Sequence, residues 1–401
     1  MLRRPLSPSH RVSTMRLAVL KERRPDEARV AATPETVKKY VGLGLEVAVE
    51  SGAGTASGIP DADFAAAGAK VCPDAASTLA GAKIVLKVAP PLGTGEGPID
   101  ELALMPQGAL LIGALNAWGD PHRLATYATL GIDAASMELL PRTTRAQSMD
   151  VLSSQANLAG YRAVIESAAS YGRAFPMLMT AAGTVPAAKV FILGAGVAGL
   201  QAIATARRLG AVVTATDVRA AAKEEIKSLG ANFVGAEPDA DAQTAGGYAK
   251  AMTPEFLAKQ AEIVGAHLAK QDIAICTALT QGRAAPRLIT AKMVEGMKPG
   301  SVIVDIASDA GGNCELTRPG EEFVTPNGVK ILGWRNWAAR LPAASSALYA
   351  KNLLTFLSTF WDKEAKAPAL KPDDDLIKGV MLTRDGAIVH PQFAPKPAQA
   401  A

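Results

Sequence analysis

The chain is poor in the residues that mark several classes of protein. It has only three cysteines, Cys72, Cys276 and Cys314, widely spaced, so we expect neither a disulfide framework nor a zinc site, and a reducing compartment fits best. The four histidines stand apart from one another and from any metal-ligand spacing, so no metal is expected. The 42 basic and 38 acidic residues nearly cancel and are spread along the chain, which gives no footprint of a nucleic-acid-binding protein.

Membrane and export signals are also lacking. The uncharged run 190–206 is long enough to suggest a membrane helix, but its glycines and strand-like start argue against one. Residues 1–14 have no apolar core and so are not a secretory signal. We interpret them as a disordered extension or a mis-assigned start, with a weakly transit-like basic segment as the alternative. No direct insertion into a membrane is expected.

What the chain does have is an alternation of strand-like and helix-like segments. Residues 15–22, 45–50 and 82–89 read as strands, and Thr33-Pro34-Glu35 reads as an N-cap, a preset first helical residue and a first-turn acid. This alternation predicts an α/β fold with mostly parallel sheets. The pattern 150–171 predicts a long helix that connects two domains.

The most informative segment is 189–217, which joins a strand to a Gly-rich turn, a helix and a second strand. Gly194 permits the tight turn, Gly196 lets the backbone approach a pyrophosphate, and Gly199 lets the helix pack closely on the strand. The helix N-terminus then offers amides to the phosphates. A plain strand-turn-helix unit is the alternative, and the flanking strand and partner acid favour a dinucleotide site.

Asp217 ends the second strand of this unit. A carboxylate there accepts hydrogen bonds from a ribose and repels an added phosphate, which favours NAD over NADP. Arg219 complicates this interpretation, because an arginine near the acid is able to accept a 2'-phosphate; we retain NAD because the carboxylate stands directly at the strand end. The further cofactor contacts expected at this edge of the sheet are Val197, Asp217, Val218, Arg219, Ala278 and Leu279.

We therefore predict two Rossmann-like, doubly wound domains, the first discontinuous in sequence. The N-terminal α/β domain is placed at 15–145 plus 345–401, because the apolar helical segment 346–362 is expected to return to it. The NAD-binding Rossmann domain is placed at 150–340.

Longer strings resemble one family. The segments 137–164, 179–221, 244–252, 297–317 and 383–391 are similar, in this order, to the NAD(H)-binding alpha subunit of proton-translocating NAD(P) transhydrogenase. The resemblance covers nearly everything from Met15 to His390 and is far more specific than a glycine motif. The family is related to alanine dehydrogenase, with which it shares the opening at 21–34.

The resemblance implies direct, reversible hydride transfer between NADH on this chain and NADP(H) on a partner subunit. It also implies a homodimer, activity only in the presence of membrane-spanning and NADP-binding subunits that carry the proton translocation, and a cytoplasmic location at the inner membrane through those partners. A transfer from one nicotinamide ring to another needs alignment and exclusion of water but no general base. Direction of flux, stoichiometry and proton path are not readable from the sequence.

The polar loop 142–153 is where the resemblance places the nicotinamide end of the cofactor. Its implied catalytic residues are Arg142, Gln147, Asp150 and Ser153. Its further implied cofactor contacts are Thr143, Thr144 and Arg145. Simpler structural roles remain open: Asp150 or Ser148 caps the following helix, Arg142 pairs with Asp150, and Ser153 is an ordinary first-turn serine.

A second loop is implied at Gly246-Gly247-Tyr248, where no helix or strand pattern holds the backbone. By resemblance, Gly247 and Tyr248 belong to a mobile segment that closes over the bound nucleotide. The alternative is a disordered connection whose tyrosine covers apolar surface.

Two other functions compete with the transhydrogenase interpretation. An NAD-dependent alanine or amino-acid dehydrogenase is suggested by Lys87 and Arg29, which match substrate-binding positions of those relatives. Such an enzyme needs a general base, and the family's histidine position is occupied at about Ala114, with no histidine before His122. The third possibility is a non-catalytic NAD-sensing module that uses the polar loop and the tyrosine only as clamps.

Overall fold

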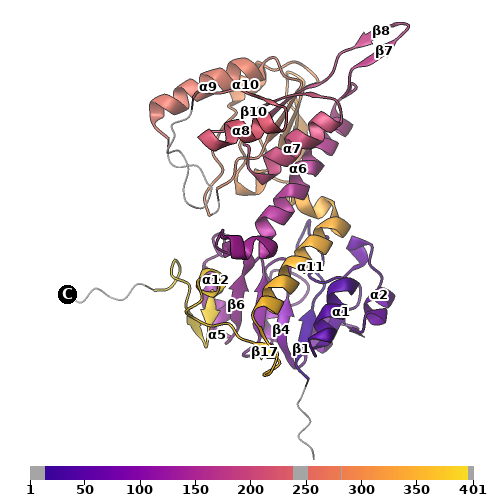
Figure 1. Ribbon diagram of the computed structural model, residues 1–401, viewed down its shortest axis with the longest axis vertical. Coiled ribbons are helices and arrows are strands. Elements are labelled where there is room, and N and C mark those ends of the chain that lie inside the picture. The colour runs from indigo at the N-terminus through magenta and orange to yellow at the C-terminus, as the bar shows by residue number, and fades with distance from the viewer. Residues whose placement is uncertain (1–13, 238–251, 281, 396–401) are drawn as a thin grey trace, which may run out of the picture. The chain divides into compact units, whose positions relative to one another are not determined.

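The chain folds into two compact units, seen in Figure 1 of the computed structural model, which describes residues 14–237, 252–280 and 282–395. Unit 1 contains the chain up to Arg24, then Arg29–Leu140, and the part from Tyr349 onward. Unit 2 contains Pro25–Ala28 and Pro141–Leu348. The first unit is therefore discontinuous in sequence, as predicted.

Unit 1 is built on a six-stranded parallel sheet in the order β3-β2-β1-β4-β5-β6. Its strands are β1 Arg16–Val19, β2 Glu46–Glu50, β3 Lys70–Cys72, β4 Ala82–Leu86, β5 Leu110–Gly113 and β6 Asp133–Ser136. The helices along this unit are α1 Pro34–Gly42, α2 Asp61–Ala66, α3 Ala75–Leu79, α4 Glu101–Leu104, α5 His122–Thr129 and α12 Asp375–Val380. Two short hairpins follow in its C-terminal part, β16 Trp361–Asp362 with β17 Ala367–Pro368 and β18 Thr383–Arg384 with β19 Ala387–Ile388. The order of the sheet is that of a doubly wound fold.

The start of α1 confirms the local prediction made from three residues. Thr33 is the N-cap, its side chain accepts a hydrogen bond from the amide of Thr36, and Pro34 opens the helix. Glu35 lies in the first turn, where the helix dipole favours an acid. Three adjacent residues thus fix the boundary of this helix without tertiary contacts.

Unit 2 contains a seven-stranded sheet in the order β11-β10-β9-β12-β13-β15-β14, parallel except at the β14 edge. Its strands are β9 Lys189–Leu193, β10 Val212–Thr216, β11 Asn232–Phe233, β12 Ile273–Cys276, β13 Val302–Asp305, β14 Glu322–Val324 and β15 Lys330–Leu332. Its helices are α6 Val151–Ser170, α7 Val197–Arg208, α8 Ala220–Ser228, α9 Pro254–Leu268 and α10 Ala291–Glu295. The helix α11, Pro342–Thr359, carries the chain back into unit 1.

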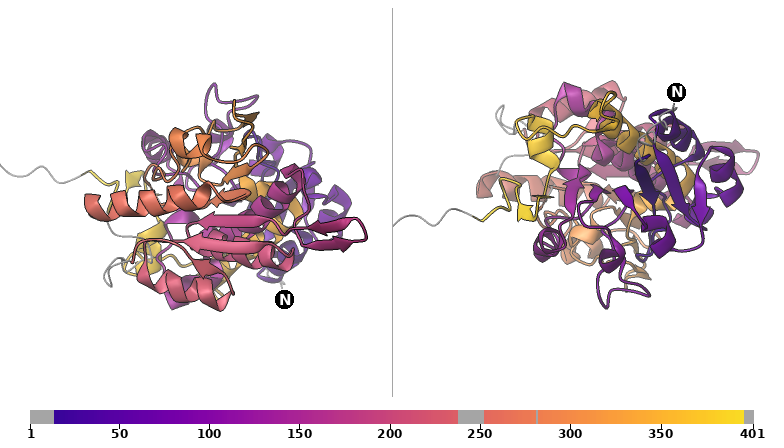
Figure 2. Two further views of the ribbon diagram at one scale, coloured as in Figure 1. Left: turned by 90° about the horizontal axis from the view of Figure 1, so that it is seen from above. Right: turned by 90° about the horizontal axis from the view of Figure 1, so that it is seen from below.

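Both faces of the unit 2 sheet are covered by helices, because alternate strand residues point to opposite sides. Val190 and Ile192 of β9 pack in one core with residues of α6, α7 and α8. Phe191 and Leu193 pack in the other core with residues of α9 and α10. Figure 2 shows α9 lying along this sheet when the molecule is seen from above. A strand that is apolar at every position is what a sheet covered on both faces requires.

The helices α6 and α7 cross at very short range. A Cβ atom on Gly160 of α6 would lie 2.1 Å from the carbonyl oxygen of Ala198 in α7. Asn157 Nδ2 of α6 also donates to Gln201 Oε1 of α7, at 3.2 Å. The glycine therefore brings α6 against the first turn of α7.

A two-stranded hairpin, β7 Leu178–Thr180 and β8 Gly183–Val185, extends away from the rest of unit 2 (Figures 1 and 2). All six residues of its strands are exposed. Apolar side chains lie on it without cover, with Met179 80% and Met177 60% exposed. Protein surfaces in water rarely leave such a cluster uncovered without a partner.

Among the described residues, no helix combines the length and the apolar character needed to cross a bilayer.

Candidate nucleotide-binding site

The glycine turn after β9 places different demands on its three glycines. Gly194 has φ of 104°, a left-handed conformation that costs other residues energy. A Cβ on Gly199 would lie 1.9 Å from the Gly194 carbonyl oxygen, so this position tolerates only hydrogen. Gly196 differs: within the described residues, a Cβ there would meet no atom within 4 Å. The protein itself does not require Gly196, and a ligand that approaches the backbone closely would.

The start of α7 is suited to an anion. Gly196 is its N-cap and, within the described ranges, no side chain caps the helix. The first-turn amides, beginning at Val197, therefore keep the partial positive charge of a helix N-terminus, which favours an anion. Together with the uncrowded Gly196, this end of α7 fits the pyrophosphate of a dinucleotide.

Asp217 follows β10 and already accepts hydrogen bonds from four donors. Its Oδ2 accepts from the Ala195 amide at 2.7 Å and from Arg219 Nη2 at 3.0 Å. Its Oδ1 accepts from the Arg219 amide at 2.9 Å and from Arg219 Nε at 3.0 Å. A carboxylate has about four acceptor positions, so a ribose hydroxyl must displace one of these donors. The guanidinium is the donor that is able to move without unfolding the turn.

Arg219 is held mainly by this carboxylate. Burial disfavours its charge, but the hydrogen bonds and negative charge of Asp217 outweigh that effect and raise the pKa of Arg219. The side chains are 14% and 9% exposed for Arg219 and Asp217 respectively. Val218 between them is half-buried at the same strand end.

Ala278 and Leu279 follow β12, on the side of β9 opposite to Asp217. The preceding Thr277 donates from Oγ1 to the Gly194 carbonyl at 2.8 Å, so this strand end contacts the glycine turn directly. Leu279 is 45% exposed. The structure thus brings Gly194, Asp217 and Ala278 to one edge of the sheet, as the strand order requires.

The polar loop contains a 3-10 helix, Thr144–Met149, anchored by the buried side chains of Ala146 and Met149. Asp150 is the N-cap of α6: its carboxylate accepts from the Ser153 amide at 2.9 Å and from Ser153 Oγ at 2.6 Å. The capping role that the sequence left open for Asp150 is therefore present. The exposed members of the loop are Arg142, Thr143, Thr144, Arg145, Gln147 and Ser148.

These loop residues are connected to the glycine turn through α6, which they precede and which packs on α7. Gly247 and Tyr248 lie outside the described residues.

Three residues at this edge were missed in the sequence. Gln260 of α9 is buried and donates from Nε2 to Thr216 Oγ1 at 2.7 Å, while its Oε1 accepts from the Ala236 amide at 2.7 Å. Thr277 and the fully buried Asn313 are the others. A buried polar residue in a helix or loop has no spacing that distinguishes it from an exposed one, so the sequence carries no signal for them.

The corresponding edge of unit 1 is chemically different. Lys87, after β4, is 1% exposed, and its Nζ lies 3.0 Å from Glu22 Oε2 and 3.1 Å from Glu101 Oε2. The hydroxyl of Tyr349 accepts from the Ala114 amide at 2.9 Å and donates to the Lys87 carbonyl at 3.1 Å. This edge is filled by the chain's own ion pairs and by a tyrosine.

No group of three or more potential metal-ligating side chains is present within 14–237, 252–280 and 282–395.

Comparison with known proteins agrees with this geometry. Residues 18–159 match the family described as alanine dehydrogenase/PNT, N-terminal domain, and residues 163–391 match its C-terminal domain. The chain is 55% identical over 379 residues to an NAD(P) transhydrogenase subunit alpha of Rhodospirillum rubrum, covering 94% of this chain and 98% of that protein. It is 32% identical to alanine dehydrogenase of Mycobacterium tuberculosis, covering 95% and 96% of the two chains.

A solved structure gives the same result. The crystal structure of transhydrogenase from Sinorhizobium meliloti superposes with a TM-score of 0.84 at 50% identity, covering 93% of this chain and all of that one. The chain therefore belongs to the alanine dehydrogenase/PNT family, and within it to the NAD(P) transhydrogenase alpha subunits, with the alanine dehydrogenases as more distant relatives.

Proposed function

We propose that this chain binds NAD(H) in unit 2 and exchanges hydride directly with NADP(H) held by a partner subunit. The observation that carries the proposal is the contrast among the three glycines. Gly194 and Gly199 are required by protein contacts, whereas a Cβ on Gly196, before the amides of α7, would meet no atom of the described ranges. An open glycine before an uncapped helix fits a pyrophosphate. Asp217 across the turn fits a ribose without a 2'-phosphate.

Bound NADH would supply the hydride, and the chain's residues would position it. We assign Arg142, Gln147, Asp150 and Ser153 to the nicotinamide end. The buried anchors Ala146 and Met149 fix the loop, and the cap of Asp150 on Ser153 fixes the start of α6. An orientation held by such anchors lowers the entropic cost of aligning two rings. No proton has to leave a side chain in this reaction, and a polar loop without a general base is sufficient for it.

The partners belong to the same proposal. The second nucleotide and the proton path are assigned to NADP-binding and membrane-spanning subunits, and the chain to the cytoplasmic face of the inner membrane. A homodimer accounts for the uncovered apolar side chains of the hairpin 178–185, which a second copy would bury. The mass of the purified chain in solution tests the dimer.

The amino-acid dehydrogenase alternative is disfavoured by unit 1. A lysine that is to bind a substrate carboxylate must be reachable, and Lys87 is enclosed with two carboxylates of its own. Tyr349 bonds to Ala114, the position at which a dehydrogenase would be expected to carry its base. Formation of NADH from alanine by the isolated chain would nevertheless establish that activity.

The direct test is cyclic hydride transfer with a purified NADP-binding partner subunit. We expect Gln147→Asn, which shortens an exposed side chain of the loop, to slow transfer while NADH affinity stays nearly unchanged. Gln107→Asn is the matched control, because Gln107 is an exposed glutamine of unit 1. Absence of hydride exchange by the wild type, despite NADH binding, would favour the sensing module instead.

A further inference from the structure

At the carboxyl edge of the unit 2 sheet, the side chain of Asn313 forms hydrogen bonds with both backbone groups of Ala278, a residue of another segment. Asn313 Oδ1 accepts from the Ala278 amide at 3.0 Å, and its Nδ2 donates to the Ala278 carbonyl at 2.9 Å. Nδ2 also donates to the Pro286 carbonyl at 2.8 Å. The carboxamide thus makes the two hydrogen bonds that a residue of a neighbouring strand would make with Ala278. It does so just after β12, where no strand of the described chain pairs with this residue.

This arrangement is needed because residues 278–288 contain no regular helix or strand among the residues described there. Backbone groups of an irregular segment have no ladder partners, so they need other donors and acceptors to fix their position. Asn313 is 0% exposed and uses both of its amide hydrogens. The buried carboxamide of Asn313 therefore holds the segment after β12 at two residues, Ala278 and Pro286.

Asn313 is itself rigidly held. Its carbonyl accepts from the amides of Leu288 and Ile289 at 2.8 and 3.1 Å. The next amide, of Cys314, donates to Asp305 Oδ2 at 3.0 Å, and Asp305 ends β13. Burial raises the pKa of Asp305, although the hydrogen bonds that its carboxylate accepts act to lower it. A fixed acceptor at the end of a core strand thus determines where Asn313 lies.

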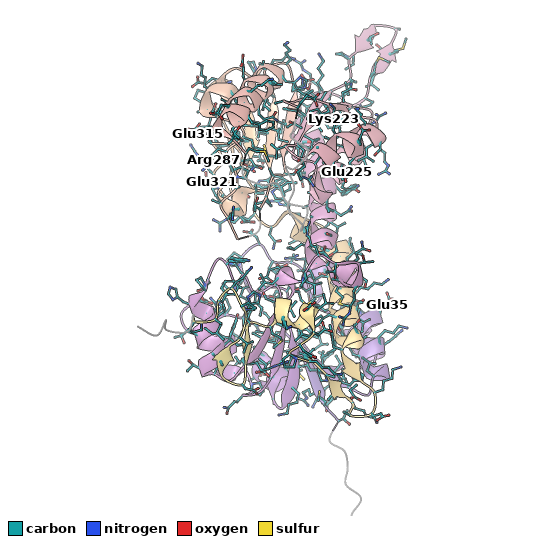
Figure 3. The ribbon with its side chains drawn as sticks, turned by 60° about the vertical axis from the view of Figure 1, so that its left-hand side comes forward. Glu35, Lys223, Glu225, Arg287, Glu315 and Glu321 are labelled. Atoms are coloured by element: carbon teal, nitrogen blue, oxygen red, sulfur yellow. The ribbon has the colours of Figure 1, made fainter. Side chains whose placement is uncertain are left out.

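The outer side of this loop is tied as well. Arg287 Nη1 donates to the carbonyls of Gly312 and Cys314 at 3.2 and 3.0 Å. Figure 3 shows Arg287 and Glu315 close together in unit 2, away from Lys223 and Glu225 of α8. Hydrogen bonds to Asp305 in the core and to Arg287 near the surface therefore fix the loop around Asn313. A loop fixed in this way is able to hold the backbone of Ala278 in place.

A shift of the Ala278 backbone would also displace the glycine turn, because the two segments are in contact. Thr277 Oγ1 donates to the Gly194 carbonyl, and a Cβ on Gly194 would lie 3.1 Å from the Ala278 amide nitrogen. The strand order puts Asp217 on one side of β9 and Ala278 on the other. A dinucleotide whose pyrophosphate lies at the turn extends to both sides. With its adenosine at Asp217, its nicotinamide half lies toward Ala278 and Leu279.

We propose that Asn313 is a positioning residue for the nicotinamide half of the bound nucleotide, acting through the backbone of Ala278 and Leu279. The inference rests on the proposed nucleotide site. It predicts a selective effect: removing the carboxamide disturbs the β12 side of the turn and leaves the adenosine side, at Asp217, intact.

The test compares NADH with 5'-AMP, which reaches only the adenosine side. We expect Asn313→Ala to weaken NADH binding about tenfold or more, to leave 5'-AMP binding within about twofold, and to speed amide hydrogen exchange at Ala278. Asn327→Ala is the matched control. Asn327 Nδ2 donates to the Val294 carbonyl at 2.9 Å from the turn between β14 and β15, away from the carboxyl edge. Its replacement should lower thermal stability without selective loss of NADH.

Three outcomes would overturn the inference: equal loss of NADH and 5'-AMP in Asn313→Ala, no loss of either, or the same selective loss in Asn327→Ala. Failure of the wild type to bind NADH and 5'-AMP would instead refute the proposed nucleotide site. If Asn313→Ala does not fold, Asn313→Ser, which keeps a donor and an acceptor, should show an intermediate loss of NADH alone. An equal loss of both ligands in that variant would also contradict the proposal.

Discussion

The crossing of α6 and α7 allows a prediction whose size follows from distances. Gly160→Ala adds a Cβ that would lie 2.1 Å from the Ala198 oxygen, 2.8 Å from its carbonyl carbon and 3.0 Å from its Cα. All three atoms are backbone, so no side chain is able to rotate away. The helices must separate by about 1 Å to restore a normal contact distance.

Overpacking of this kind costs about 1–3 kcal/mol, and the rigid backbone puts the cost near the upper end. The better helix propensity of alanine returns about 1 kcal/mol, which leaves a net destabilisation of about 2 kcal/mol. Ala198 is in the first turn of α7, so the same shift moves the proposed phosphate-binding amides. Loss of one charge-assisted hydrogen bond, about 1.5–3 kcal/mol, corresponds to roughly tenfold to hundredfold weaker NADH binding.

Thermal unfolding and NADH titration measure the two effects in one preparation. The matched control is Gly42→Ala at the end of α1, where a Cβ would meet nothing within 4 Å in the part of the chain that the structure describes. That variant should be as stable as the wild type or more so, with unchanged NADH affinity. A Gly160→Ala protein that melts and binds NADH as the wild type does would refute the argument from close helix contact.

Two further predictions concern single side chains. Gly196→Ala should leave thermal stability unchanged, because the new Cβ meets no atom of the described residues. It should nevertheless weaken NADH binding at least tenfold, which titration would detect, and unchanged affinity would contradict a pyrophosphate there. In unit 1, the hydrogen bond from Arg123 lowers the pKa of Glu96 from 4.5 to about 2. Because the Glu96 carboxylate is one-third exposed, its pairing with Arg123 stabilises the folded state by under about 1 kcal/mol. This contribution is full above about pH 4.5 and is lost as the pH falls toward 2. Urea unfolding of Glu96→Gln and wild type across this range should converge at the acid end.

The fold was predictable where the signals are local. Thr33-Pro34-Glu35 marks a helix start by its own chemistry. The glycine spacing after β9 is also local, because Gly194 adopts a positive φ and Gly199 packs against the Gly194 carbonyl of the same turn. Such features need no knowledge of distant residues.

What the sequence did not reveal depends on contacts between distant segments. Asn313 and Ala278 are 35 residues apart, and Gln260 and Thr216 are 44 apart. The residue type alone does not show whether an asparagine is buried or exposed. Only the fold shows which backbone groups its side chain forms hydrogen bonds with. The hairpin at 178–185 was missed for another reason: it contributes no residue to a core, so no burial pattern marks it.

The two units show why the same strand order does not give the same function. In both, β-strands end at a carboxyl edge in the order of a doubly wound sheet. In unit 2 the turn after β9 is made of glycines, and Gly196 leaves the amides of α7 accessible to an anion. In unit 1 the chain after β1 carries Glu22, whose carboxylate pairs with the buried Lys87, so this edge has an ion pair where unit 2 has a glycine turn. The chemistry of the first turn, and not the strand order of the sheet, therefore distinguishes the two units.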